Sequence, residues 1–237
     1  RFGLGQSQYQ NNLVEEALLT FENMYKTNES IQELNYVLGI LYSSKIIGLD
    51  NSKNQSSATS NGKASVQNED VMNKAFFFLE KYIRLTRAKK NQLVNLNAYL
   101  VLSQLYEIKN LYDKSLHCLS KVVEQLEYMN EMIPLEVYNN MACYYFSLNN
   151  MAKAKEFFNK AKEANVDSSS VLTIDYNIAR TSEETDDTVD FAVDSYSNIL
   201  KTNPSYITAR MRNIFIDYVR GERGEKLESE IEKLMRQ

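Results

Sequence analysis

The sequence predicts an all-α protein, a right-handed superhelical α-solenoid of about six helix pairs. Large apolar residues recur every three or four positions along most of the chain, which is the spacing of one helix face. The same helix–turn–helix pattern returns at intervals of 34 to 39 residues, which is typical of stacked repeats. The composition agrees, because the 237 residues include only seven Gly and two Pro, the residues that interrupt helices.

The clearest repeat lies between Tyr138 and Ala161. Its first half places large apolar residues on one helix face, namely Tyr138, Met141, Tyr145 and Leu148. After a break at Asn149-Asn150, a second helix is predicted from the spacing of Ala154, Phe157, Phe158 and Ala161. Small residues alternate with bulky ones where the two halves meet. We therefore expect closely packed helices, with Tyr145 largely buried between them.

The register of this repeat recurs elsewhere. It fits two more segments, Tyr99, Leu102, Ser103, Tyr106, Ser115, Leu119 and Val122, and Leu4, Gly5, Ala17, Phe21 and Met24. Another first helix, with Leu38, Gly39 and Tyr42, begins one 34-residue period after the N-terminal one. The turns inside three repeats hold Asn12, Asn110 and Asn149. Asparagine is the next-best residue after glycine for a left-handed turn, so the chain is expected to reverse there.

This pattern resembles the tetratricopeptide repeat, a sequence of about 34 residues with an aromatic, Leu, Gly or Ala and Tyr, then Ala, an aromatic and Ala. The family usually has glycine at the turn where this chain has asparagine. The resemblance implies that each repeat is a helix hairpin that contacts its neighbours, and that the array presents a surface for extended or helical protein segments.

The helix pairs are expected in order along the chain. Repeat one has helices over 1–10 and 13–24, and repeat two opens at a capping box, Ser30-x-x-Glu33, with a first helix to about Gly48. Its second helix resumes at Ala75. The remaining pairs are repeat three over 91–129, repeat four over 134–164, repeat five with helices near 171–180 and 192–199, and repeat six over 205–220 and 225–236.

We expect one repeat array over residues 1–237, as a fragment of a longer repeat protein, because the sequence starts inside a repeat and ends in a charged helical pattern. Residues 51–70 form a polar insertion within repeat two that is predicted to be disordered, since it has too few apolar residues to offset the entropy of ordering. Lengthening a turn from about 5 to about 25 residues costs only about 1.4 kcal/mol, which a stable hairpin tolerates.

Composition and motifs argue against several classes of function. A net charge of −4 and a pI near 5.3 disfavour a nucleic-acid-binding surface. The single histidine, His117, with Cys118 and Cys143 cannot supply the about four ligands of a zinc site. The sequence shows no nucleophile–base pair, no phosphate loop and no apolar run near the roughly 18 residues that span a membrane. We therefore expect a non-enzymatic protein without a cofactor, metal or membrane contact.

Three charged clusters need an interpretation. Arg210, Arg212, Arg220 and Arg223 form a candidate basic contact for an acidic partner. The acidic segment 183–187 lacks the glycine and final glutamate of a calcium loop, so we interpret it as a solvated linker. The third cluster is interpreted as the positively charged end of a helix, because cations are stabilised at a helix C-terminus. It consists of Lys81, Arg84, Arg87, Lys89 and Lys90.

The tetratricopeptide resemblance also implies which residues line the binding groove, since five positions of each first helix face it in that family. The candidate protein-binding residues at these positions are Tyr36, Ile40, Leu100, Gln104, Asn139, Cys143 and Phe146. The groove positions contain no Lys or Arg, which speaks against the variant that clamps a C-terminal carboxylate. An apolar and neutral groove indicates a hydrophobic peptide or helix from a stable partner.

Three stretches are similar to a narrower family, the tetratricopeptide scaffold subunits of the RNA polymerase II-associated factor complex. They are Phe2-Gly3-Leu4-Gly5-Gln6 with Ala17 and Phe21-Glu22, Asn139-Asn140-Met141 through Phe157-Phe158, and Asp175-Tyr176-Asn177-Ile178-Ala179-Arg180. The last stretch departs from the generic repeat and is the more specific sign. The resemblance implies a nuclear scaffold that binds the other subunits and RNA polymerase II, and supports transcription elongation and histone modification without direct nucleic-acid contact through this segment.

Two alternatives stay open at this point. The chain could be a repeat scaffold of another assembly, such as a ubiquitin ligase or an RNA-processing complex. It could also be the regulatory repeat array of an enzyme whose catalytic domain lies outside this sequence. Co-purification with elongation factors would distinguish the first, and the full-length sequence the second.

Overall fold

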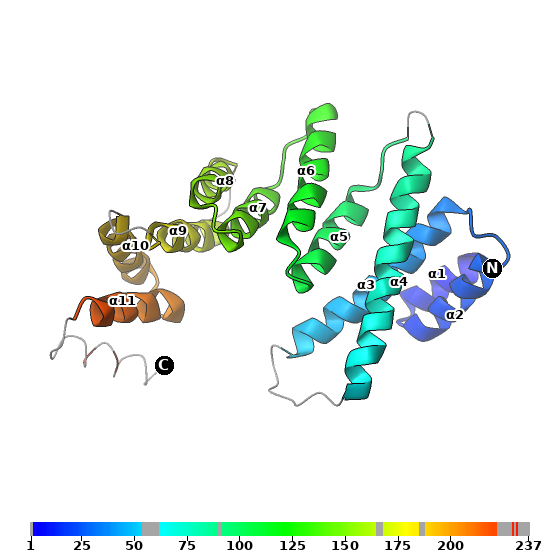
Figure 1. Cartoon of the computed structure of the whole chain (residues 1–237), viewed down its shortest axis with the longest axis horizontal. Coiled ribbons are helices and arrows are strands. Elements are labelled where there is room, and N and C mark those ends of the chain that lie inside the picture. Colours follow the sequence, from blue (N-terminus) through cyan, green and yellow to red (C-terminus); the bar gives the residue numbers. More distant parts are fainter. Residues whose placement is uncertain are drawn as a thin grey trace. The chain divides into compact units, whose positions relative to one another are not determined.

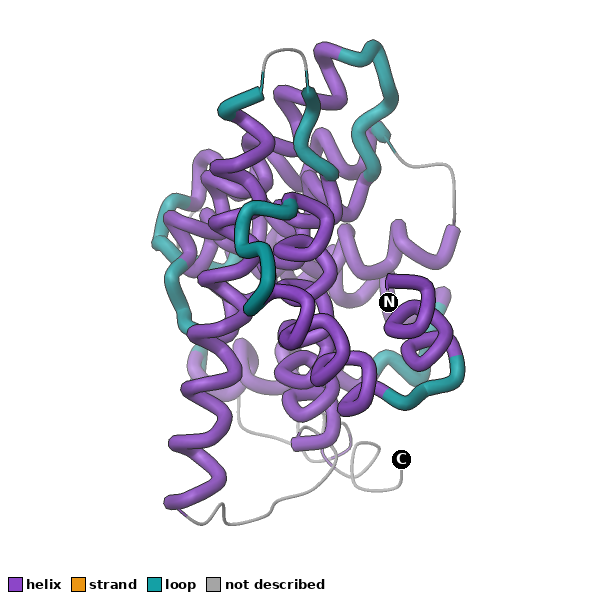
Figure 2. Tube along the Cα trace, turned by 90° about the vertical axis from the view of Figure 1, so that its right-hand side faces the viewer, coloured by secondary structure: helices purple, strands orange, loops and turns teal. Residues whose placement is uncertain are grey.

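The computed structural model describes residues 2–53, 62–89, 92–164, 168–184, 188–221, 229 and 231. Within these ranges it contains eleven α-helices and no strand (Figure 2), which confirms the all-α prediction. The helices are α1 (Phe2–Gln10), α2 (Val14–Tyr25), α3 (Gln32–Lys53), α4 (Gly62–Arg87), α5 (Leu96–Ile108), α6 (Tyr112–Tyr128), α7 (Leu135–Ser147), α8 (Met151–Glu163), α9 (Ser168–Ser182), α10 (Val189–Thr202) and α11 (Ile207–Val219).

The chain divides into two compact units, each of which stacks its helices as hairpins (Figure 1). Unit 1 spans 1–130 and pairs α1 with α2, α3 with α4 and α5 with α6. Unit 2 spans 131–237 and pairs α7 with α8 and α9 with α10, with α11 against α10. Inside each unit a hairpin contacts the next one, as α3 and α4 contact α5 and α8 contacts α9. This nearest-neighbour stacking is an α-solenoid arrangement.

The predicted sixth pair is represented by its first helix, α11. Its expected partner over 225–236 lies outside the described residues apart from Ser229 and Ile231. Both ends of the polar insertion 51–70 are helical, because α3 continues to Lys53 and α4 begins at Gly62. The expected disorder of the intervening residues 54–61 concerns positions outside those that the structure describes.

Asparagines reverse the chain at the predicted turns. Asn12 (φ 61°), Asn110 (φ 56°) and Asn149 (φ 58°) adopt the left-handed conformation, and Asn130 (φ 54°) does so after α6. A non-glycine residue visits this region at a cost, which the short polar side chain of asparagine reduces. The second helix of each hairpin begins two residues after the first three asparagines. The turn prediction is therefore confirmed, with Asn130 as an addition.

Small residues allow the two helices of a hairpin to approach closely. A Cβ on Gly5 would lie 2.6 Å from Phe21 Cζ. A Cβ on Gly39 would lie 2.7 Å from Leu79 Cδ2 and 3.1 Å from the Leu79 backbone nitrogen. Ala142, at the same repeat position, is fully buried. The glycine-or-alanine position of the repeat is thus set by the packing of the second helix against the first.

In repeat four the fully buried tyrosine is Tyr144, and Tyr145 is less buried than expected although it packs against the core between α7 and α8. Tyr144 exposes 3% of its surface, whereas Tyr145 is half-buried with its ring 5.3 Å from that of Phe157. Three- and four-residue steps both follow a helix face, and here the buried stripe runs through Val137, Met141 and Tyr144. Tyr145 therefore lies at the edge of the interface.

Candidate protein-binding surfaces

The candidate surface of unit 1 lies on its first helices α3 and α5. We call Tyr36, Ile40, Leu100 and Gln104 the unit 1 face. Tyr36, Ile40 and Leu100 are half-buried, and Gln104 is exposed. Asn97 Nδ2 of α5 donates a hydrogen bond of 3.1 Å to the Tyr36 hydroxyl of α3, and the Tyr36 ring lies 5.0 Å from that of Tyr82. The unit 1 face therefore combines a fixed aromatic ring with aliphatic side chains that are only partly covered.

The candidate surface of unit 2 lies on α7, and α9 contributes to it as well. Asn139, Cys143 and Phe146 are half-buried and form, with Asn177, the unit 2 face. Asn177 Nδ2 lies 3.1 Å from Asn139 Oδ1, to which it donates, and 4.0 Å from Cys143 Sγ. The Arg180 guanidinium lies 5.6 Å from the centroid of the Phe146 ring, a cation–π contact.

Sequence reasoning did not assign Asn177 and Arg180 to this surface. The signal was present, because both belong to the Tyr-Asn-x-Ala-Arg run that departs from the generic repeat. The structure gives that run a local role. Tyr176 packs into the core with its ring 5.6 Å from Tyr196, Ala179 is fully buried, and the two polar side chains contact α7.

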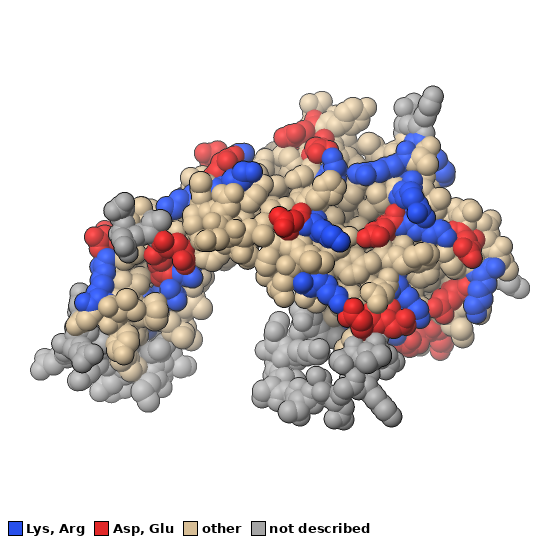
Figure 3. Space-filling model, in the orientation of Figure 1, with Lys and Arg blue, Asp and Glu red and all other residues tan. Residues whose placement is uncertain are grey.

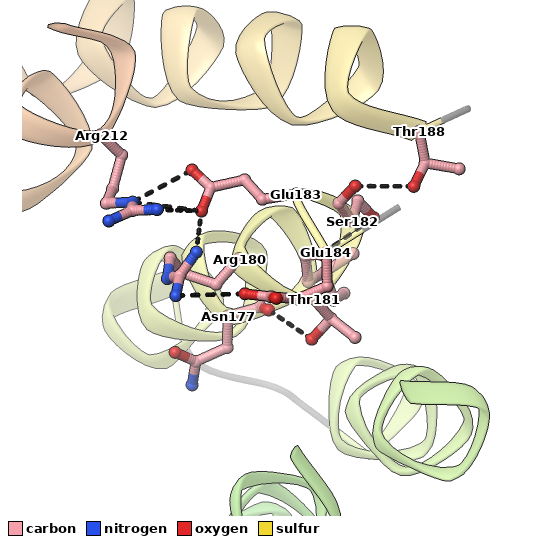
Figure 4. A network of polar contacts seen from close by, with 9 residues as sticks. Asn177, Arg180, Thr181, Ser182, Glu183, Glu184, Thr188 and Arg212 are labelled. Carbon is pink, nitrogen blue, oxygen red and sulfur yellow. Dashed lines mark hydrogen bonds and ion pairs between the residues drawn. The ribbon is translucent and has the colours of Figure 1, made fainter. Parts of the chain in front are cut away.

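Next to this surface, Glu183 connects α9 with α11 (Figure 4). Its carboxylate, only 5% exposed, pairs with Arg180 and accepts hydrogen bonds from Arg212, 2.7 Å from Nη2 and 3.1 Å from Nε. Arg180 also reaches Glu184 at 3.6 Å. The interpretation of 183–187 as a solvated linker is therefore wrong for Glu183, because two arginines compensate a carboxylate that burial would otherwise destabilise. Residues 185–187 lie outside the described part of the chain.

The candidate basic contact is not an open basic surface. Arg210 is 8% exposed and donates through Nη2 to the Pro204 carbonyl at 2.6 Å. Arg212 is paired with Glu183, and Arg220 pairs with Asp190 at 2.7 Å. Arg223 lies outside the described residues. The three described arginines thus contact groups of unit 2, because α11 turns them toward α9, α10 and the turn before α11.

The described residues supply no constellation for metal chemistry, since no three His, Cys, Asp or Glu side chains among them gather as ligands. None of the described helices has the length and apolar character needed to cross a membrane. Burial raises the pKa of the Cys118 thiol to about 12, which keeps it protonated and unreactive at neutral pH. Burial and the hydrogen bond to Glu22 also raise the pKa of the Tyr42 hydroxyl.

Comparisons with known proteins agree with both levels of the sequence resemblance. A tetratricopeptide-repeat family model matches residues 135–165. The RNA polymerase-associated protein CTR9 of Saccharomyces cerevisiae is 44% identical over 238 residues, which cover 99% of this chain and 21% of that protein. Tetratricopeptide repeat protein 1 of Schizosaccharomyces pombe is 29% identical, with 90% of this chain and 19% of that protein covered. The chain therefore spans about a fifth of the length of these curated relatives.

Solved structures of other repeat proteins share the fold. The C-terminal part of a repeat-containing protein from Cytophaga hutchinsonii matches with a TM-score of 0.64 at 12% identity, covering 100% of this chain and 78% of that chain. YrrB, described as a TPR protein with an unusual peptide-binding site, matches with a TM-score of 0.53 at 14% identity, covering 91% and 90%. At such low identity the likeness shows the fold alone, and it confirms the α-solenoid.

Proposed function

Because this chain is homologous to a segment of the Saccharomyces cerevisiae RNA polymerase-associated protein CTR9 and consists of tetratricopeptide-type helix pairs, we propose that it belongs to a scaffold subunit of an RNA polymerase II-associated factor complex. In this proposal the protein is nuclear and non-enzymatic. It holds other subunits of the complex near RNA polymerase II, and so supports transcription elongation and co-transcriptional histone modification.

The observation that carries the proposal is the 44% identity along 99% of the chain, which includes all the helices that bear the candidate surfaces. The unit 1 and unit 2 faces supply a physical means of binding. Half-buried residues such as Ile40, Leu100 and Phe146 lie beside hydrogen-bonding groups such as Gln104 and Asn139. An apolar anchor surrounded by polar groups is the usual source of protein–protein affinity.

The charges on these faces favour a protein partner over nucleic acid. Neither face includes a lysine or an arginine, and Arg180, which borders the unit 2 face, is paired with Glu183 and Glu184. Affinity for nucleic acid depends on clustered cations that neutralise phosphates. We therefore propose that this segment contacts protein, and that any nucleic acid in the complex is bound elsewhere.

Purification of the tagged parent protein, followed by mass spectrometry, tests the proposal. We expect the other subunits of the polymerase-associated factor complex and RNA polymerase II to co-purify in stoichiometric amounts. Subunits of a ubiquitin ligase or of an RNA-processing complex in their place would contradict it. A separate titration of the 237-residue chain against the reconstituted subunits tells whether this segment itself makes the contact.

A further inference from the structure

Unit 1 has a second candidate surface, an open pocket of about 580 Å³ between α4 and α6 with α5 beneath it. We call it the inter-repeat pocket. It is lined by Glu80, Ile83, Arg84, Arg87, Tyr99, Leu102, Tyr106, Asp113, Lys114, His117 and Cys118. Its volume falls in the range of about 300–1,000 Å³ that is common for ligand-binding clefts. None of its residues belongs to the unit 1 face.

The floor of the pocket is apolar and rigid. Ile83, Tyr99, Leu102 and Cys118 are 9% exposed or less, so each is held in the core of unit 1 while one edge borders the pocket. The thiol of Cys118 is kept neutral by the burial described above. Such a floor can accept an aliphatic or aromatic side chain, which would gain the free energy of leaving water without any rearrangement of the pocket.

The rim carries three exposed cations, Arg84, Arg87 and Lys114. Figure 3 shows cationic side chains gathered over the C-terminal part of α4. Arg87 lies 5.8 Å from the Tyr99 ring centroid and Lys114 lies 5.3 Å from that of Tyr106. None of the three forms an ion pair with another described residue.

Among the described side chains of unit 1, Lys26 and Lys89 also form no ion pair, but neither lines the pocket. Five lysines of the unit have a carboxylate partner within 3.4 Å, namely Lys45, Lys74, Lys81, Lys109 and Lys121. A corresponding pocket of about 460 Å³ exists in unit 2, lined by α8, α9 and α10. There the rim cation Lys162 is neutralised by Asp175 at 2.7 Å. A helix C-terminus accounts for the presence of Arg84 and Arg87 at the end of α4, but it does not account for their position on the rim of a pocket.

We propose that the inter-repeat pocket binds an acidic segment of a partner protein, with one large apolar side chain on the floor and flanking carboxylates on Arg84, Arg87 and Lys114. The inference rests on the proposed scaffold function and names the chemistry of one partner segment. Arginine favours such a role because its planar guanidinium can bind a carboxylate through two parallel hydrogen bonds.

The rim also favours a peptide over RNA. Glu80, which accepts a hydrogen bond of 2.7 Å from the Tyr106 hydroxyl, and Asp113 place two carboxylates at the same pocket. A phosphate backbone would meet these carboxylates along its path, whereas a peptide can space its own acids to avoid them. The apolar floor adds an anchor that a phosphate backbone cannot use.

Fluorescence anisotropy with four labelled probes tests the inference. The probes are a short peptide of alternating Asp or Glu with Phe and Leu, the same peptide with Ala for Phe and Leu, the same peptide with Lys for the acids, and a single-stranded RNA of equal charge. We expect the acidic, apolar peptide to bind the chain about tenfold more tightly than any other probe, which corresponds to about 1.4 kcal/mol.

The variant Arg84→Glu/Lys114→Glu should weaken binding of the acidic, apolar peptide about tenfold, because it replaces two charge attractions by two repulsions. The control Lys26→Glu/Lys89→Glu makes the same change in charge at exposed positions of unit 1 outside the pocket, and should bind like the unaltered chain. Equal binding of all four probes, tighter binding of RNA, or an equal loss in the control would overturn the inference. If the peptides fail while the chain still binds the reconstituted subunits, the pocket assignment falls and the proposed function stands.

Discussion

Tyr144 and Tyr145 are adjacent in the chain, but Tyr144 is the more deeply buried of the two. Tyr144 is 3% exposed, whereas Tyr145 is half-buried against Phe157 and near Lys153. Helical spacing allowed either residue to continue the buried stripe, because both lie three or four positions after Met141. Packing against the neighbouring helices decides between them, and a single sequence does not contain that information.

This difference predicts the stability of two alanine variants. Tyr144→Ala should lower the free energy of unfolding by about 3–5 kcal/mol, because it leaves a cavity in the core. Tyr145→Ala should cost about 1–2 kcal/mol, since its side chain is only partly buried. Urea unfolding followed by circular dichroism measures both. A larger loss for Tyr145→Ala would restore the register that the sequence first indicated.

At the scale of the helix, the hairpins depend on one small residue each. Gly39 brings α3 so close to α4 that a Cβ would meet both the side chain and the backbone nitrogen of Leu79. Gly3 lies on α1 with no atom within 4 Å of the position a Cβ would occupy. The two glycines are therefore helical positions with opposite tolerance for a methyl group.

We predict that Gly39→Ala destabilises the chain by about 1–3 kcal/mol, since the added methyl group must push Leu79 and its backbone away. Gly3→Ala should instead stabilise α1 by about 0.5–1 kcal/mol through the better helix propensity of alanine. The comparison of thermal unfolding midpoints for the two variants checks this. A neutral Gly39→Ala would show that the hairpin has room to spread.

Glu183 links α9 to α11 through its ion pairs with Arg180 and Arg212. Its buried carboxylate compensates Arg180 and Arg212, whose side chains are 24% and 29% exposed. Sequence analysis assigned it to a linker because acidic residues cluster there. Arg180 lies only three positions before it, but nothing local in the sequence indicates Arg212, 29 positions away, as the second partner. Such a long-range ion pair becomes visible only when the helices are placed in space.

Glu183→Gln should lower the stability of unit 2 by about 1–3 kcal/mol, because it leaves the partly buried Arg212 guanidinium without its anion and Arg180 with only the longer contact to Glu184. Glu184→Gln removes the same charge from a side chain that is 40% exposed, and should change stability by less than about 0.5 kcal/mol. Hydrogen exchange of the backbone amides in α9–α11 measures the stability of unit 2 in each variant and so distinguishes the effect of Glu183→Gln from that of Glu184→Gln. Equal effects of both variants would mean that Glu183 acts only through the net charge.

Over the whole molecule, the repeat pattern predicted the fold class, the helix pairs and three of the four asparagine turns. These features depend on local spacing and on small residues, which a sequence displays directly. The candidate binding surfaces were harder to predict from the sequence. The family positions led to the unit 1 face and to most of the unit 2 face, but not to Asn177, because its contact with Asn139 joins residues 38 positions apart. The pairing of the basic residues was missed for the same reason, since Arg212 and Arg220 meet their acids 29 and 30 positions away.

The central claim is that the first-helix faces hold a protein partner. The variant Gln104→Arg/Ser147→Arg adds bulk and charge on the unit 1 face and at exposed Ser147, which directly follows Phe146 of the unit 2 face on α7. The variant Asn23→Arg/Asn159→Arg makes the same change at exposed positions of the second helices α2 and α8. All four positions are exposed, so both variants should fold. This design separates the faces from the rest of the surface.

The most direct measurement is a titration of these chains against the reconstituted subunits of the polymerase-associated factor complex near physiological salt. The account predicts that the unaltered chain and the Asn23→Arg/Asn159→Arg control bind alike, and that Gln104→Arg/Ser147→Arg binds at least about tenfold more weakly, a loss of about 1.4 kcal/mol. Equal binding by all three chains, or no binding of any subunit together with submicromolar, steeply salt-dependent binding of DNA or RNA, would contradict it.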